Sequence, residues 1–256
     1  MINDKIKVRV SNFVINVIEN DCLNFNFVKK DNSPNKNDFL NKLIPNLLNL
    51  RKSRRQQIKD TLSQDLYRDN SEDIYNIVNY LIDQVYFSDI ELEQLDSEIW
   101  IRPQKNYMEY FDEIENSETK ITCLDMTSYI RSLLNEYVRF PQYKRISILF
   151  KTELEIIDQA VESKRLLNFR YINEKYKIYV YNYYYGYITD QNTYIIGYDT
   201  NKKQIIPFLL QDMKSLYIVQ QKFNSDESLD NILDDYAKSY DFLENKIIQI
   251  KEIENE

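Results

Sequence analysis

The sequence predicts an α+β chain built from several small units rather than from one large domain, and three observations lead to this view. A short strand of alternating basic and apolar residues opens the chain and is followed by two amphipathic helices. The same order of strand and helices returns near residue 98. Five short β-rich runs, separated by turn-like segments, then fill residues 166–223, which is the spacing of a small β-barrel.

The first strand covers residues 5–10. Side chains alternate along a strand, so its two faces differ: Ile6, Val8 and Val10 share one, and Lys5, Lys7 and Arg9 share the other. A strand this short needs a partner strand. We expect it to pair with residues 98–102 of the same chain or with its equivalent in a second protomer. We favour the intrachain ribbon, with a homodimer formed elsewhere.

Two helices follow this strand. Ser11 is placed to cap the first, whose apolar stripe extends to Phe25. The second begins near Asn35, has its apolar face between residues 39 and 47, and contains Pro45, which predicts a kink or a split. A helical connector should then cover residues 51–96. Its basic cluster is read as a solvated helix face, with contact to a DNA backbone as the alternative, and consists of Arg51, Lys52, Arg54 and Arg55.

The second half of this region repeats the first. Residues 98–102 alternate again, and Pro103 is suited to the first turn of a helix. When the two segments are aligned, Asp125 corresponds to Asn35, and three pairs of adjacent apolar residues also correspond. Phe39-Leu40, Leu43-Ile44 and Leu47-Leu48 align with Tyr129-Ile130, Leu133-Leu134 and Tyr137-Val138. The copy is degenerate, because the first helices match poorly, and both Glu98 and Asp125 place acids where contact with DNA favours positive or neutral groups.

A strand with a basic face followed by two helices resembles the ribbon-helix-helix DNA-binding family, over about residues 4–48. In that family two units pair their strands into an antiparallel ribbon, which lies in the major groove, while the second helix holds a phosphate at its N-terminus. The resemblance implies a nucleic-acid surface made of Lys5, Lys7, Arg9, Asn35, Lys36, Asn37, Trp100 and Arg102. The alternative is an ordinary β-α-α start to a larger domain.

The C-terminal half reads as a bridge, a helix over residues 153–163, and a barrel of the SH3 or Sm type. Its motifs are Gln159-Ala160-Val161, Lys164 to Tyr171, Thr193 to Asp199, Pro207 to Leu210, and Phe223. These resemble the WYL domain, a ligand-sensing Sm-like barrel of transcription regulators and phage-defence systems. The order ribbon-helix-helix, helical middle and WYL also resembles a subgroup that accompanies type VI CRISPR effectors.

The WYL resemblance implies a ligand surface that includes Arg170, Tyr171, Lys177 and Tyr194. The family usually places arginines around its last strands, where this chain has Ile206, Leu209 and Asp212. Affinity for anionic ligands should therefore be weak.

These readings divide the chain into five parts. They are a ribbon-helix-helix at 1–50, a helical connector at 51–96, a degenerate second copy with a bridge at 97–150, a WYL barrel at 151–223, and a C-terminal helix with a short strand at 224–256.

Composition disfavours most enzymes. The chain has no His, two Cys and two Gly, so common acid–base sites, zinc cages and glycine-rich phosphate loops are excluded, and we expect no catalytic residue, metal or cofactor. The two cysteines favour a cytoplasmic location. No segment is apolar enough for a membrane span.

The charge is uneven along the chain. Residues 1–60 hold 12 Lys and Arg against 6 Asp and Glu, whereas the whole chain has a net charge of −8. A basic N-terminal region suggests a nucleic-acid partner, DNA rather than RNA. The sequence thus favours a DNA-binding transcriptional regulator whose barrel senses a ligand, such as a nucleotide or oligonucleotide. The alternatives are an RNA-binding accessory factor of a CRISPR or phage-defence system, with an effector protein as partner, and an interaction protein in which both modules are degenerate.

Overall fold

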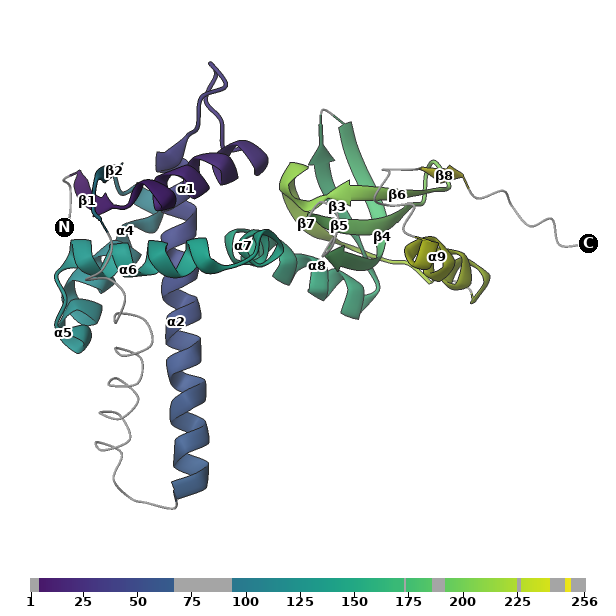
Figure 1. Ribbon diagram of the computed structural model, residues 1–256. Helices are drawn as coiled ribbons and strands as arrows, with labels where there is room; N and C mark the ends of the chain where they lie inside the picture. The colour runs from purple at the N-terminus through teal and green to yellow at the C-terminus, as the bar shows by residue number, and fades with distance from the viewer. Residues whose placement is uncertain are drawn as a thin grey trace, which may run out of the picture. The chain divides into compact units, whose positions relative to one another are not determined.

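The computed structural model describes residues 5–66, 94–172, 174–185, 192–224, 227–239 and 247–249. The chain divides into two compact units, Met1–Phe140 and Pro141–Glu256 (Figure 1). The described elements of the first unit are β1 (Ile6–Val10), α1 (Asn12–Asn24), α2 (Lys36–Leu66), β2 (Ser97–Ile101), a 3₁₀ turn (Lys105–Tyr107), α4 (Met108–Glu113), a π-helical turn (Ile114–Glu118), α5 (Thr119–Thr122) and α6 (Met126–Arg139).

The first and second strands form an antiparallel ribbon within one chain, which confirms the predicted intrachain pairing. Ile6 is opposite Ile101, and Val10 is opposite Ser97. The apolar side chains of both strands are buried on one face, as alternation requires. The first half of this unit consists of β1, α1 and α2, and the second half extends from β2 to α6. β1 packs on α6 and β2 packs on α2, so a helix of each half covers the strand of the other half.

The repeat predicted from the apolar pairs is also visible in the helices. The Asn35 and Asp125 side chains accept hydrogen bonds from backbone N–H groups three residues on, at 3.4 and 2.9 Å, so they occupy equivalent positions at the starts of α2 and α6. All twelve residues of the six matched pairs are buried. The first helices of the two copies differ. The first copy has one continuous helix, α1, whereas the second copy has α4, a π-helical turn and α5 in its place.

Pro45 does not split the second helix. α2 continues through it to Leu66, so of the predicted kink or split the split is wrong, and the first part of the predicted connector belongs to the second helix of the ribbon unit. The residues around Pro45 are buried on the core side, and this packing compensates for the backbone hydrogen bond that a proline cannot donate. The rest of the predicted connector, from residue 67 to 93, lies outside the described residues.

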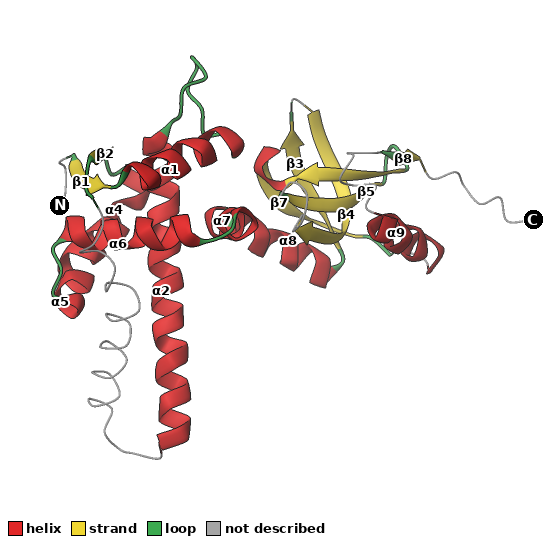
Figure 2. Cartoon of the chain, viewed as in Figure 1, coloured by secondary structure: helices red, strands yellow, loops and turns green. Residues whose placement is uncertain are grey.

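The second unit contains two helices followed by a sheet (Figure 2). Its elements are α7 (Gln142–Leu149), α8 (Lys151–Ser163), β3 (Arg165–Tyr171), β4 (Glu174–Tyr185), β5 (Thr193–Asp199), β6 (Gln204–Leu209), a 3₁₀ turn (Leu210–Asp212), β7 (Met213–Lys222), α9 (Glu227–Ser239) and β8 (Ile248–Gln249). The five predicted β runs are confirmed, and the apolar run at 146–150 belongs to a helix.

The sheet is antiparallel and has the order β7-β3-β4-β5-β6-β8. Among the described strands no ladder joins β7 to β6 or to β8, so the predicted closed barrel is not confirmed. One face of this sheet is covered by α9 through Leu233, Tyr236 and Ala237, which pack with Tyr179 and Tyr194. No helix in the described part of the chain has both the length and the apolar character that a membrane crossing needs.

Candidate nucleic-acid interface

The exposed face of the ribbon carries most of the predicted nucleic-acid residues. Lys7 and Arg9 on β1, and Lys5 directly before it, are all exposed. On β2, Trp100 lies opposite Lys7 and is 44% exposed, while Glu98 lies opposite Arg9. The strand alternation predicted from the sequence therefore places a basic and aromatic surface on the solvent side of a buried apolar face.

The two lysines of this face are held by their neighbours. The Lys5 and Lys7 ammonium groups lie 4.4 and 5.4 Å from the centre of the Trp100 ring, within the range of a cation–π contact. Lys7 also forms an ion pair with Glu98 at 2.6 Å. The Arg9 guanidinium has no ion-pair partner within the described residues, and its carbonyl oxygen accepts a hydrogen bond from Arg131 Nε at 2.6 Å. Arg9 is thus anchored through its backbone, and its side chain is exposed.

The start of α2 meets the end of β2. The Asn37 side-chain oxygen accepts a hydrogen bond from the Arg102 backbone N–H at 2.8 Å, so this pair of predicted residues is brought together. Lys36 is paired with Glu19 at 2.6 Å. The Asp38 carboxylate accepts a hydrogen bond from the Asn35 amide at 2.5 Å, which places a negative charge in the first helical turn. A phosphate site at this helix start stays a prediction, with Asp38 opposing it.

The equivalent helix start in the second copy is fully occupied by its own cap. The Asp125 carboxylate accepts hydrogen bonds from the hydroxyls of Thr127 and Ser128, at 2.5 and 2.7 Å, and from the Ser128 N–H. Desolvation opposes the charge, but these hydrogen bonds outweigh it and lower the pKa of Asp125 to about 2. This end of α6 therefore carries a fixed negative charge and repels phosphate.

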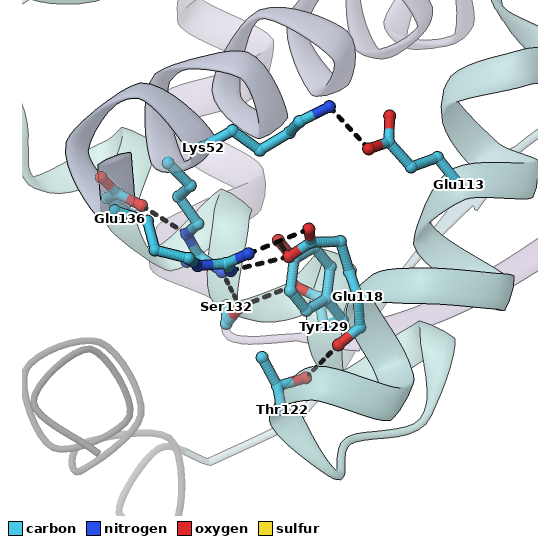
Figure 3. A network of polar contacts seen from close by, with 9 residues as sticks. Lys52, Glu113, Glu118, Thr122, Tyr129, Ser132 and Glu136 are labelled. Atoms are coloured by element: carbon cyan, nitrogen blue, oxygen red, sulfur yellow. Dashed lines mark hydrogen bonds and ion pairs between the residues drawn. The ribbon is translucent and has the colours of Figure 1, made fainter. Parts of the chain in front are cut away.

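Only part of the basic cluster on α2 is buried: both interpretations made from the sequence are wrong for Arg51, whereas Lys52 is exposed. The Arg51 side chain is only 2% exposed and donates to Glu136 and Ser132, each at 2.8 Å. Arg54 reaches the same carboxylate at 2.6 Å, and Arg55 pairs with Glu118 at 2.8 Å. Figure 3 shows the polar network around Glu118, Ser132 and Glu136, with the exposed pair of Lys52 and Glu113 beside it.

The Glu118 carboxylate of this network also accepts a hydrogen bond from the Tyr129 hydroxyl at 2.8 Å. Desolvation opposes the charge of this carboxylate, but the hydrogen bonds from Arg55 and Tyr129 lower the pKa of Glu118 overall. Burial, together with the neighbouring carboxylate, raises the pKa of Tyr129. The network is a set of compensated charges that joins α2 to the second copy, and it leaves Arg51 unavailable to DNA.

In the second unit, two of the four predicted ligand-surface residues line one cavity of about 330 Å³. These two are Arg170 on β3 and Lys177 on β4. Tyr171 is half-buried beside this cavity's strands, packs edge-on against Phe208, and its hydroxyl accepts the Leu209 N–H at 3.4 Å.

Tyr194 is not on this surface. It is 2% exposed and belongs to the apolar core under α9, because β5 is covered on both faces. The motif tyrosine that suggested a ligand contact is a core residue here. The cavity is also lined by Lys175, Ser215 and Tyr217, which were not among the predicted ligand-surface residues, since their positions depend on the register of three strands.

Comparisons with known proteins support the fold. No family model matches the chain, and no curated protein matches it. A solved structure described as a CRISPR Cas-related protein is similar with a TM-score of 0.68 at 11% sequence identity. The similarity covers 88% of this chain and 65% of that chain, so this chain spans less than two thirds of its neighbour's length.

A second solved structure is the proteasome accessory factor B/C of Arthrobacter aurescens. It shares 14% identity, and the similarity covers 52% of this chain and 24% of that chain with a TM-score of 0.26. The chain therefore has the fold of a CRISPR Cas-related protein of known structure.

Proposed function

We propose that this protein is a DNA-binding regulator of the ribbon-helix-helix type, in which one chain supplies both strands of the ribbon. The observation that carries the proposal is the intrachain pair of β1 and β2, which buries one face and exposes Lys5, Lys7, Arg9 and Trp100 on the other. The exchange of strands between the two halves is the arrangement expected when two strand–helix–helix units pair. A two-stranded ribbon fits the major groove of B-DNA.

Within this proposal Arg9 is the residue that reads bases. Its side chain is exposed and makes no ion pair among the described residues, whereas Lys5 and Lys7 both lie over the Trp100 ring, and a guanidinium can contact guanine through two hydrogen bonds. Lys7 contributes less, because Glu98 shares its charge at 2.6 Å. The second unit acts as the sensor of a ligand. The role is one of binding and regulation rather than catalysis.

The test is fluorescence anisotropy of the full chain with labelled duplex DNA, duplex RNA, and single-stranded DNA and RNA, at several salt concentrations. We expect duplex DNA to bind best, because the major groove of duplex RNA is too narrow for a ribbon. Arg9→Ala should cost about 1–3 kcal/mol on a preferred site and relax its sequence preference. Lys120→Ala, which removes an exposed cation from α5, is the matched control and should change little.

A second candidate is an RNA-binding accessory factor of a CRISPR system. The fold similarity to a CRISPR Cas-related protein favours it, as does the exposed Trp100 ring, since aromatic rings beside cations stack on unpaired bases. Under this hypothesis single-stranded RNA binds more tightly than duplex DNA, and Trp100→Ala weakens binding more than Arg9→Ala does. The same panel of four nucleic acids therefore separates the two functions.

A further inference from the structure

Three adjacent strands of the second unit form a basic surface with a hollow in it. The hollow has a volume of about 330 Å³. Its lining comes from β3, β4 and β7 and from the turn after β5, and consists of Asn168, Phe169, Arg170, Lys175, Tyr176, Lys177, Asn201, Ser215 and Tyr217. The lining contains three cationic side chains and no acidic one.

The register of the sheet gathers two of these cations with a third, Lys214, which lies beside the hollow and not in its lining. Arg170 on β3 lies opposite Lys175 on β4 and opposite Lys214 on β7. Like charges directly opposite each other destabilise a sheet. None of these three has an ion-pair partner within the described residues, whereas Lys202 in the same unit pairs with Glu174 at 3.1 Å. An uncompensated group of cations in a chain of net charge −8 indicates an anionic ligand.

The backbone of β7 is irregular at the same place. The register of β7 against β3 shifts between Asn168 and Arg170, and Ser215 has φ of 56°, a left-handed conformation that residues other than glycine rarely adopt. Bulges of this kind redirect side chains and are common beside binding sites. Ser215 lines the hollow, so the irregular segment is part of its wall.

The bulge is followed by an exposed aromatic side chain. Tyr217 lies opposite Asn168 and is 57% exposed. Its hydroxyl accepts a hydrogen bond from the Asn168 amide at 2.9 Å, which fixes the ring at the edge of the hollow. An exposed ring beside cations offers stacking to a planar group together with charge for a phosphate.

We propose that this surface binds a nucleoside phosphate, either as a free nucleotide or as the phosphorylated end of a single strand. The phosphate contacts Arg170 and Lys175, and the base stacks on Tyr217. The hollow is of a size to hold one nucleotide but not a duplex. The inference rests on the proposed sensor role of the second unit. It assigns the anion site to residues of β3, β4 and β7 and not to Ile206, Leu209 and Asp212, the positions at which the WYL resemblance implies arginines.

The test is isothermal titration calorimetry with the full chain. The probes are adenosine 5′-monophosphate, adenosine, inorganic phosphate, and a single-stranded hexanucleotide with and without a 5′-phosphate. We expect AMP or the 5′-phosphorylated strand to bind at least tenfold more tightly than its form without phosphate. The tighter of these two ligands identifies the source. Arg170→Gln and Lys175→Gln should each weaken binding about tenfold, which corresponds to about 1.4 kcal/mol.

Tyr217→Ala should weaken the two nucleotide probes about tenfold and leave inorganic phosphate unchanged. The matched control is Lys151→Gln on α8, which removes a partly exposed cation from the same unit and should have no effect. The ribbon variant Arg9→Ala should also bind these probes normally. The inference is overturned if neither nucleotide probe binds, if the phosphate makes no difference, or if Arg170→Gln binds like the unaltered chain. Failure of duplex binding would instead refute the ribbon proposal and leave this site standing.

Discussion

The ion pair of Arg51 and Glu136 gives the sharpest prediction about stability. Arg51 on α2 is 2% exposed at its side chain, and Glu136 on α6 is 7% exposed. Arg51 also donates to Ser132 at 2.8 Å, and its guanidinium lies 5.3 Å from the centre of the Tyr129 ring. The pair therefore joins the second helix of one half to the second helix of the other in a place that water hardly reaches.

The two partners should not be equivalent. Replacing Glu136 with Gln leaves a buried guanidinium without its counter-charge, and breaking a buried pair in this way costs about 3–5 kcal/mol. Replacing Arg51 with Met leaves Glu136 with Arg54, which reaches it at 2.6 Å, so the cost should be smaller. The double variant removes both charges, and it should be more stable than the sum of the two single costs implies.

The only tryptophan of the chain makes the measurement specific to the first unit. Trp100 lies on β2, so its fluorescence reports unfolding of the first unit during urea denaturation at pH 7. Lys52→Met is the control, because it breaks the exposed pair with Glu113 and should cost at most about 1 kcal/mol. The reasoning is refuted if Glu136→Gln costs less than the control, or if the two single costs simply add in the double variant.

Three further predictions concern single positions. Asp125→Ala should lower stability by about 1 kcal/mol at pH 7 through loss of the helix cap, with Asp125→Asn as the milder control. Since the folded-state pKa of Asp125 is about 2, below its ordinary value of 3.8, this stability is fully present above pH 4 and is lost as the pH falls towards 2, which acid titration of the fluorescence would show. Gly197→Ala would place a Cβ 2.4 Å from Ile178 Cδ1 and should cost about 1–3 kcal/mol, and the added change Ile178→Val, which removes that methyl group, should restore much of it in thermal unfolding followed by circular dichroism. Burial raises the pKa of the Cys22 thiol to about 12, so a thiol reagent at pH 8 should modify exposed Cys123 quickly and Cys22 only on unfolding; rapid reaction of both would contradict this.

Local periodicity made much of the fold predictable. Alternation in residues 5–10 and 98–102 identified the faces of both ribbon strands, because a side chain on a strand has only two directions to take. The match of Asn35 with Asp125 identified equivalent helix starts, because a cap depends on one side chain and a backbone N–H three residues away. The five β runs of the second unit were found in the same way.

Features that depend on distant partners were not predictable in this way. Arg51 looked like part of a solvated face, and its partner Glu136 is 85 residues further along the chain. Tyr194 looked like a ligand contact, because the sequence does not show that helix α9 covers its strand. The hollow beside Tyr217 depends on a register shift and a left-handed serine, neither of which has a sequence signature here.

The excess of positive charge in the N-terminal region is another feature whose role depends on partners distant in the sequence. Of the 12 Lys and Arg in residues 1–60, at least six form ion pairs with described acids, and the five acids that these six share lie on α1, on β2 or in the second copy. Glu113, Glu118 and Glu136 neutralise cations of α2 in this way. Much of the basic character therefore holds the two halves together and is not free to meet a nucleic acid.

This use of charge also explains why the second copy is acidic. If two identical chains formed the ribbon, an acidic residue on the strand would occur twice. Here both strands belong to one chain and differ in sequence, so an acidic residue can occur on one strand alone. Glu98 then pairs with Lys7, Asp125 caps α6, and Arg9 keeps an unpaired side chain among the described residues. The second half thus supplies acids that pair with cations of the first, and under the proposed function Arg9 is the side chain through which the ribbon contacts a nucleic acid.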